Sequence, residues 1–417
     1  MADQRTGLLA LTSDERPAFW ATFFGWGLDG FDYMLYALVL GTLITVFKLS
    51  DTQGGLLGTF TLALSALGGI IAGTVSDRIG RVRTLAIAVL VYSVFTFLSG
   101  FATSFGTLLA FRALEGLGFG GEWAVGSVLI AETVAPERRG RILGLVQGSW
   151  ALGWAVAVIA SVVLLPNFGA LGWRLMFWLG VLPALLVFYI LRRVREPEIW
   201  RQEGRKAARG LSFPRLFSSR IIRITVWTSL LAVGAQSGYY AIFTWLPTYL
   251  STVRHLSVIG SGGYLFMVIA GSFTGYILSG YFTDRLGRKM NFAIFSILSG
   301  VIILAYTHFT ISNVTMLILS FPLGFFASGI FSGFGPFLAE LFPNEARGAG
   351  QGFAYNFGRG VAAFAPVSVG ALAGIYGLAG SMSIFGPGVY LLCIIALLFL
   401  PETKGRALQS IGDPEMA

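Results

Sequence analysis

Six ionisable side chains stand inside long apolar stretches of the sequence, where a charge is costly and therefore points to a function. They are Asp29, Asp32, Arg112, Glu115, Glu122 and Arg359. In GWGLDGFDYMLY, the spacing i, i+3, i+4, i+7 places four polar side chains on one helix face: Asp29, Asp32, Tyr33 and Tyr36. Two neighbouring carboxylates in a poorly solvated cavity repel each other, so one of them holds a proton near neutral pH. The pair predicts a proton-coupling site; the alternative is that Asp32 only accepts hydrogen bonds from neighbouring helices.

The stretch FRALEGLGFGGEW places an arginine among acids. Arg112, Glu115, Phe119 and Glu122 follow i, i+3, i+7, i+10 and share one helix face. An arginine buried beside acids sets how readily they hold protons, and it can release a proton when substrate binds or the conformation changes. We expect Arg112, Glu115 and Glu122 to take part in proton coupling. The alternative is a static buried ion pair.

The stretch GFAYNFGRGVAAFAP contains an arginine that is suited to recognition of an anion. Tyr355 and Asn356 precede Arg359 by four and three residues, so the three side chains project together from a helix. The guanidinium fork fits a carboxylate through two parallel hydrogen bonds. We expect these residues to bind an organic anion; the alternative is that Arg359 pairs with Asp29 or Glu122 across a cavity.

Neutral donors and aromatic rings occur at helical spacing in two further stretches, as is typical of ligand pockets. The candidates are Gln236, Tyr239, Tyr240, Gln147 and Trp150. We expect them to line the substrate site together with Tyr33 and Tyr36. The alternative is core packing with an aromatic belt at the membrane interface, and that reading is favoured for Trp154.

These residues lie on stretches that are long and apolar enough to span a membrane. Hydrophobic residues make up 55% of the 417 residues and charged residues 12%, whereas a soluble protein carries about 25% charged residues. Spans need roughly 20 mostly apolar residues. We predict twelve spans, at 18–46, 52–75, 84–102, 105–131, 140–163, 172–192, 221–250, 259–283, 290–308, 313–339, 347–374 and 378–400. The organisation is a first half at 1–192, a polar linker at 193–220 and a second half at 221–417.

The distribution of lysine and arginine predicts the orientation of the spans. Of 29 such residues, Lys48, Arg174 and Arg254 lie on one side of the membrane and Arg112 and Arg359 within spans, which leaves 24 on the other side. Basic loops face the cytoplasm. We therefore expect both termini and the linker to be cytoplasmic, in a monomer embedded in the lipid bilayer of the inner cell membrane. Because the basic residues lie in short loops, the net charge of +9 does not indicate a nucleic-acid partner.

Two phrases of the sequence occur twice at nearly the same separation. GTVSDRIGR at 73–81 matches GYFTDRLGR at 280–288, and ETVAPERRG matches ELFPNEARG. The chain is therefore a duplicated unit of roughly 200 residues. Acids and arginines at helix ends that can pair in one conformation and separate in another suit a gate. The expected cytoplasmic gate comprises Asp77, Arg78, Arg81, Glu132, Arg139, Asp284, Arg285, Arg288, Glu340 and Arg347. The alternative is that these arginines only hold the orientation of the spans.

The doubled G-x-x-x-D-R-x-G-R loop resembles the signature of the major facilitator superfamily, and the resemblance covers the whole chain. LDGFDYMLYALVL, GFGGEW, GWRLMFWLGVLPALL and GFAYNFGRGVAAFAP resemble the sialic-acid proton symporters. The D-G-x-D pattern at Asp29 and Asp32, WLPT, and the pair Gly358–Arg359 resemble the aromatic-acid proton symporters. The resemblance implies an all-α membrane protein with twelve transmembrane helices in two six-helix pseudo-repeat bundles. It also implies symport of a small organic acid, with a proton as the coupling ion.

Several other functions are disfavoured. The sequence has no phosphate-binding G-x-x-x-x-G-K-[ST] loop and no nucleophile-elbow frame, so we expect no enzyme. A single cysteine, Cys393, and two histidines give no metal-ligand spacing, so we expect no metal and no cofactor. PETKGR and GPFLAELFP resemble sugar porters, which leaves a sugar or polyol porter as the main alternative. A nutrient sensor, which would carry a long signalling extension, and an exporter of organic cations using Asp29 and Asp32 are weaker alternatives.

Overall fold

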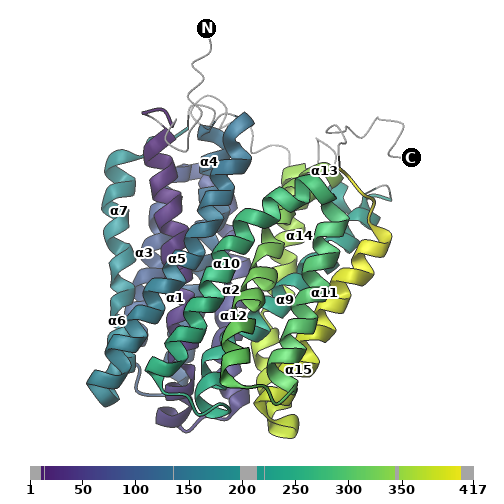
Figure 1. Cartoon of the computed structure of the whole chain (residues 1–417). Helices are drawn as coiled ribbons and strands as arrows, with labels where there is room; N and C mark the ends of the chain where they lie inside the picture. Colours follow the sequence, from purple (N-terminus) through teal and green to yellow (C-terminus); the bar gives the residue numbers. More distant parts are fainter. Residues whose placement is uncertain are drawn as a thin grey trace.

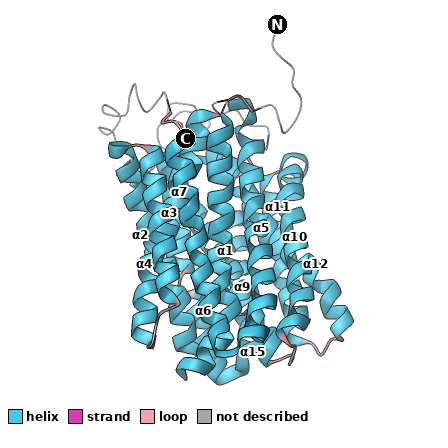
Figure 2. Ribbon diagram, turned by 90° about the vertical axis from the view of Figure 1, so that its left-hand side faces the viewer, coloured by secondary structure: helices cyan, strands magenta, loops and turns pink. Residues whose placement is uncertain are grey.

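The computed structural model describes residues 11–13, 15–134, 136–197, 214–219, 221–342 and 347–404. Within these residues the chain is helical and contains no strand (Figure 2). The first half consists of α1 (Glu15–Phe47), α2 (Asp51–Ile79), α3 (Arg81–Ser99), α4 (Phe105–Thr133), α5 (Pro136–Phe168), η1 (Gly169–Leu171), α6 (Gly172–Trp178), η2 (Leu179–Val181) and α7 (Leu182–Arg193). After η4 (Pro214–Phe217), the second half consists of α9 (Ile222–Thr252), α10 (Val258–Leu286), α11 (Arg288–His308), α12 (Asn313–Gly329), η5 (Ile330–Gly333), α13 (Phe334–Leu341), α14 (Arg347–Ala362) and α15 (Ala365–Phe399).

These helices account for the twelve predicted spans. α1 to α5 and α9 to α11 each correspond to one span, α6 with α7 forms the sixth, and α12 with α13 forms the tenth. The eleventh span runs through α14 into α15, and Gly377, with φ of +70°, separates it from the twelfth. Eight helical stretches of the described residues are long and apolar enough to cross a membrane, and two of them hold 52 and 50 residues. The protein is an integral, multi-pass membrane protein.

Short polar turns start the helices at the end of the molecule opposite to the termini. The hydroxyl oxygens of Ser50, Ser104, Ser257 and Ser312 accept hydrogen bonds from the first turns of α2, α4, α10 and α12. Ser50 and Gln53 cap each other reciprocally. Such caps satisfy backbone N–H groups that a helix leaves without partners. These connections therefore stay short, and the helices stand side by side (Figure 1).

The two halves use the same packing scheme. In the first half α1 packs on α5, α2 on α4, and α3 on α4 and α7. In the second half the repeat-related helices do the same: α9 packs on α14, α10 on α12, and α11 on α12 and α15. The halves meet where α5 contacts α10, α1 contacts α9, and α2 contacts α14 and α15. Helices α1, α2, α5, α9, α10 and α14 thus surround the junction of the halves.

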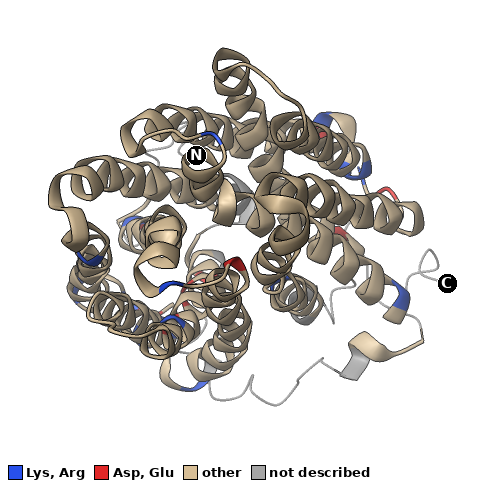
Figure 3. Cartoon of the chain, turned by 90° about the horizontal axis from the view of Figure 1, so that it is seen from below, with Lys and Arg blue, Asp and Glu red and all other residues tan. Residues whose placement is uncertain are grey.

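The halves touch most closely near the end of the molecule opposite to the termini. A Cβ atom on Gly55 of α2 would lie 2.5 Å from the carbonyl oxygen of Pro366 in α15, and one on Gly370 would lie 2.4 Å from that of Asp51. Trp245 of α9 donates its indole N–H to Pro366 O at 3.0 Å. Backbone meets backbone here, so this side of the junction is closed. Seen from this end, charged residues are few (Figure 3).

Candidate functional site

Helix α1 carries the acidic centre of the first half. The side chains of Asp29, Asp32, Tyr33 and Tyr36 are fully buried. None of the four carboxylate oxygens of Asp29 and Asp32 has a hydrogen-bond partner among the described residues. The two aspartates interact with each other and have different nearest neighbours, because Asp29 lies beside Glu122 whereas Asp32 lies beside Arg112 and Glu115. The polar helix face predicted from the sequence is therefore present. One of its aspartates lies beside an acid, and the other lies beside an ion pair.

Helix α4 supplies a buried ion pair. The Nη1 atom of Arg112 binds Oε2 of Glu115, and both side chains are excluded from solvent. The guanidinium also lies 4.8 Å from the ring centre of Tyr36. Asp32 lies close enough to Arg112 for the two charges to interact. One guanidinium thus serves two carboxylates, Glu115 directly and Asp32 through space.

Glu122 lies about two turns further along the same face of α4, toward the termini, and packs against α1. A Cβ atom on Gly25 would lie 2.2 Å from Oε1 of Glu122, so the glycine provides the space that this carboxyl occupies. Neither oxygen of Glu122 has a hydrogen-bond partner among the described residues. Asp29 and Glu122 therefore form a pair of neighbouring buried carboxyls with no cation in contact.

Arg359 on α14 is a buried cation without a carboxylate. Its side chain is 1% exposed. It makes no ion pair within the described residues, and its Nε and Nη1 atoms have no hydrogen-bond partner there. The guanidinium carbon lies 5.5 Å from the ring centre of Tyr355 and 5.7 Å from that of Phe119. The pairing of Arg359 with Asp29 or Glu122, considered from the sequence, does not occur in this conformation.

Aromatic side chains from both halves surround this position. The ring centres of Tyr33 and Tyr240 are 5.5 Å apart, and those of Tyr33 and Phe119 are 6.1 Å apart. Trp150 of α5 donates its indole N–H to the hydroxyl of Tyr239 at 2.8 Å, and Tyr33 and Thr244 share a hydrogen bond of 2.8 Å. The rings predicted from α1, α5 and α9 therefore meet at one place, next to Arg359.

In the part of the chain that the structure describes, the other predicted substrate-site residues show no ring contact with the guanidinium of Arg359, and three of them form hydrogen bonds within the protein. Tyr36 donates its hydroxyl to Gly54 O at 2.6 Å, and Gln236 donates its amide to Tyr355 O at 2.9 Å. Asn356 donates its amide to Gly352 O at 2.9 Å, within its own helix. Gln147 is partly exposed, and its amide oxygen has no partner among the described residues. Gln236 holds the backbone before Arg359, so it supports this segment of α14.

Two residues of α3 belong to the acidic centre and escaped the sequence analysis. Tyr92 is fully buried and interacts with Asp29, and Thr96 lies beside Asp32. A Cβ atom on Gly180 would meet both Thr96 and Asp32, which shows that these residues adjoin the same backbone. Their i, i+4 spacing in an otherwise apolar span was the available signal.

At the end of the molecule that bears the termini, Arg81 holds helices of the first half together. Its Nη2 atom lies 2.9 Å from Oε1 of Glu132, and its Nε donates to Oε2 at 3.2 Å. This two-point contact joins the start of α3 to the end of α4. Glu196, beyond α7, accepts hydrogen bonds from the backbone N–H groups of Arg81 at 2.8 Å and Val82 at 3.1 Å. Three helices are thus tied together within one half.

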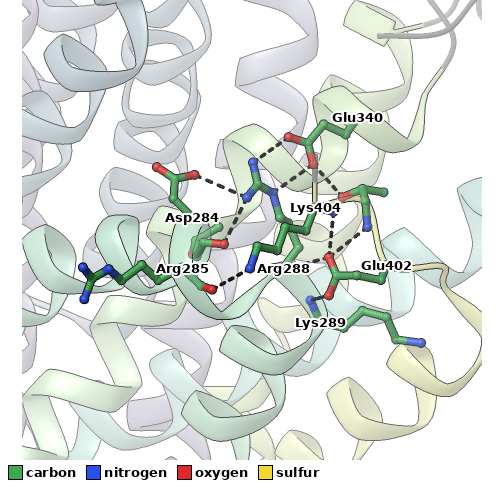
Figure 4. A network of polar contacts seen from close by, with 9 residues as sticks. Asp284, Arg285, Arg288, Lys289, Glu340, Glu402 and Lys404 are labelled. Atoms are coloured by element: carbon green, nitrogen blue, oxygen red, sulfur yellow. Dashed lines mark hydrogen bonds and ion pairs between the residues drawn. The ribbon is translucent and has the colours of Figure 1, made fainter. Parts of the chain in front are cut away.

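The second half repeats this arrangement (Figure 4). Arg288 binds Glu340 through Nη2 at 2.7 Å and through Nε at 2.9 Å, and Asp284 lies 3.3 Å from its Nη1. Glu402 accepts from the backbone N–H groups of Arg288 and Lys289, each at 3.0 Å. Partial burial opposes the charge of Glu402, but these N–H donors outweigh burial and hold the pKa of its carboxyl below the ordinary value.

Glu196 and Glu402 extend the repeat beyond what the sequence analysis found. They lie 206 positions apart, as the repeat requires, and each caps the helix that follows a glycine of positive φ, Gly80 or Gly287. Of the remaining predicted gate residues, Arg78 and Arg285 are exposed. The side chains of Asp77, Arg139 and Arg347 lie outside the described residues.

Within the part of the chain that the structure describes, no group of three or more His, Cys, Asp or Glu side chains is placed to hold a metal. The site is instead a buried set of carboxyls, two guanidiniums and aromatic rings at the junction of two repeated helical halves. Polar centres of this kind between repeated membrane bundles are typical of secondary transporters.

The chain belongs to the major facilitator superfamily, whose family model matches residues 22–310 and 265–415. A probable 4-methylmuconolactone transporter from Cupriavidus pinatubonensis is 37% identical over 402 residues, which cover 96% of this chain and 94% of the relative. A cis,cis-muconate transport protein from Acinetobacter baylyi is 31% identical, with coverage of 94% and 96%. The protein is therefore a transporter related to organic-acid transporters, and not an enzyme.

A solved structure shares the fold. The crystal structure of a D-xylose-proton symporter superposes with a TM-score of 0.77 at 21% identity, covering 94% of this chain and 99% of the other. The predicted all-α fold with two repeated bundles of transmembrane helices is confirmed.

Proposed function

We propose that the protein is a proton-coupled symporter that imports a small organic acid anion by alternating access. The anion is a monocarboxylate, an aromatic acid or a sugar acid. The observation that carries this proposal is the buried guanidinium of Arg359, which has no carboxylate within the described residues. A buried charge without a partner is strongly destabilising, and a carboxylate substrate would remove that cost. The rings of Tyr355 and Phe119, which lie near the guanidinium, suit a planar acid.

The balance of charge at the centre supports proton coupling. Four carboxyls are fully buried there, those of Asp29, Asp32, Glu115 and Glu122, whereas Arg112 and Arg359 are the buried arginines of the same region. If every acid were ionised, two negative charges would remain without a counter-charge in a poorly solvated site. Protonation of acids removes this excess at lower cost than burial of the charges. We assign the carried proton to the Asp29–Glu122 pair or to Asp32, with Arg112 and Glu115 tuning it.

Binding and protonation are coupled through Arg359 in this proposal. In the empty protein Arg359 lies close enough to Asp29 for the two charges to attract each other through space. A bound carboxylate neutralises Arg359, so the acid gains a proton. With both charges neutralised, closing the cavity around the bound substrate buries no unpaired charge, so the free energy of the closed state is lower. Tyr33, Tyr239, Tyr240, Trp150 and the amides of Gln147, Gln236 and Asn356 would line the route.

Alternating access would proceed by movement of the bundle at 1–192 against the bundle at 221–417, joined by the linker at 193–220. The Arg81 and Arg288 networks would keep the cytoplasmic ends of each bundle in shape. We place both termini in the cytoplasm of a monomer in the inner membrane, on the basis of the lysine and arginine bias. No bound cofactor is needed, because the proton is the coupling ion.

The test is uptake into proteoliposomes with an imposed pH gradient. The candidate substrates are radiolabelled benzoate, lactate and sialic acid, with glucose for the alternative; cis,cis-muconate, a dicarboxylate, is added because of the relative named for its transport. We expect at least one organic acid to accumulate when the outside is acidic, and Arg359→Gln to abolish that uptake. Arg223→Gln, at an exposed arginine of the same half, is the matched control. Uptake of glucose that ignores both pH and Arg359→Gln would establish the alternative, a sugar or polyol porter.

A further inference from the structure

An apolar groove opens on the outer surface of the first half, between α1 and α7. Its volume is about 580 Å³, and its walls include Trp20, Phe24 and Leu28 on α1 and Leu182, Leu185 and Tyr189 on α7. Trp20, Phe24 and Leu185 are 41%, 49% and 64% exposed. α7 lies at the outer edge of the molecule, away from the other half (Figure 1). The groove therefore faces the bilayer and not the substrate site.

Arginines mark the end of the groove that lies toward the termini. On α1, Arg16, Trp20, Phe24 and Leu28 follow one another every four residues and share one helix face. α7 runs antiparallel and ends at Arg192 and Arg193, the latter close enough to Tyr189 to interact with it. The twelve residue steps from Arg16 to Leu28 span roughly 18 Å of helix, which is close to one leaflet, about 15 Å of hydrocarbon.

These arginines are available for a ligand. Arg16, Arg192 and Arg193 are exposed, and none of the three forms an ion pair within the described residues. One N–H group of Arg16 is used, as its Nε donates to Leu11 O at 3.0 Å. The groove thus combines an apolar slot one leaflet deep with a cluster of positive charge at the interface.

The other half supplies an internal comparison. Arg223 and Trp227 stand 207 positions after Arg16 and Trp20, the same separation as the repeat. Trp227 stacks on Phe399 of α15, with ring centres 4.1 Å apart and planes 10° apart. Phe399 is the counterpart of Arg193, because both residues end their helices and they stand at the separation of 206 that also relates Glu196 to Glu402. In the second half an aromatic ring therefore fills the position, whereas in the first half an arginine replaces the ring and the slot stays open.

We propose that the α1–α7 groove binds an anionic phospholipid of the leaflet next to the termini. One acyl chain occupies the slot, and the headgroup phosphate is bound by Arg16 with Arg192 and Arg193. The charge complementarity and the depth of one leaflet select a phospholipid over a water-soluble anion. The site is independent of the transport function proposed above, because it uses only surface residues of the first half.

The experiment is native mass spectrometry of the full chain in detergent, titrated with phosphatidylglycerol or phosphatidylcholine. Each basic residue near an anionic headgroup contributes about fivefold to affinity. Arg16→Gln/Arg193→Gln should therefore weaken phosphatidylglycerol binding roughly 25-fold, while phosphatidylcholine binding stays weak. Arg193→Phe, which copies the second half, should remove a charge and fill the slot, and should weaken binding at least tenfold.

Arg223→Gln is the matched control, and it should change phosphatidylglycerol binding by less than about twofold. Equal binding of the two lipids by the unaltered protein overturns the proposal, because the arginines would then select nothing. So does a loss of less than about threefold in Arg16→Gln/Arg193→Gln, or an equal loss in Arg223→Gln. All substituted positions are exposed, and elution as a single species in size exclusion checks that each variant is folded.

Discussion

Arg112 and Arg359 are both buried near the centre of the molecule, one in each half, yet their surroundings are opposite. Arg112 holds Glu115 and stands near Asp32, whereas Arg359 contacts two rings and no carboxylate within the described residues. At the end that bears the termini the halves agree, because Arg81 and Arg288 bind Glu132 and Glu340 in the same two-point manner. The repeat is thus retained where it holds helices together and lost where substrate and proton would bind.

The contrast between the two central arginines is tested by making the same substitution at both. Arg112→Leu leaves Glu115 buried and unpaired, which should cost about 3–5 kcal/mol of stability. Arg359→Leu removes a buried charge and leaves no carboxylate unpaired, so it should stabilise the protein, by about 1–4 kcal/mol. Thermal unfolding of the two variants in detergent measures the difference. Equal losses would mean that Arg359 has a partner in the resting protein after all.

The agreement between the halves can be tested at the glycines before α3 and α11. Gly80 and Gly287 have φ of +110° and +99°, and an added Cβ would lie 2.2 Å from Glu196 or 2.8 Å from Glu402. Alanine should cost about 1–3 kcal/mol at each position, more at Gly80 because its contact is closer. Unfolding of Gly80→Ala and Gly287→Ala is compared with Gly73→Ala, where nothing lies within 4 Å. A loss at only one of the two would show that the halves are not equivalent there.

The acidic centre is tested by Glu122→Gln, which keeps shape and removes the titratable group. A gradient of one pH unit supports about tenfold accumulation for each proton carried. We expect this variant to lose that accumulation and to retain exchange of labelled for unlabelled substrate. Glu132→Gln, in the first-half network, serves as the comparison because it should lower stability and leave the coupling ratio unchanged. Retained accumulation in Glu122→Gln would assign the proton to another acid.

The smallest effect is expected at the helix caps. Glu402→Gln should cost about 0.5 kcal/mol, because the carboxyl is largely exposed and its interactions are screened. The pKa of Glu402 is lowered in the folded state, so its contribution is complete above the unfolded value of about 4.3 and disappears as pH falls through the folded pKa. Unfolding of the two proteins at pH 7 and pH 3 should therefore differ only at pH 7. A difference that persists at pH 3 would point to packing instead of charge.

The sequence predicted the spans, the repeat and the buried ionisable residues well, because each rests on local composition or on spacing within one helix. Residues brought together from distant segments were harder. Glu196 and Glu402 cap helices that begin more than a hundred positions earlier. Tyr92 reaches Asp29 only because α3 packs against α4 and α7. Helical spacing places Asp29 and Asp32 on one face, but only packing determines that one meets Glu122 and the other Arg112.

The Arg81–Glu132 and Arg288–Glu340 pairs each lie inside a single half. A relative movement of the halves would leave them intact, so the activation barrier would contain no cost for breaking either pair. That barrier would instead come from the backbone contact of Gly55 with Pro366 and from the apolar packing around it. Salt screens exposed charges but not such contacts. The rate of interconversion should thus depend strongly on temperature and little on ionic strength.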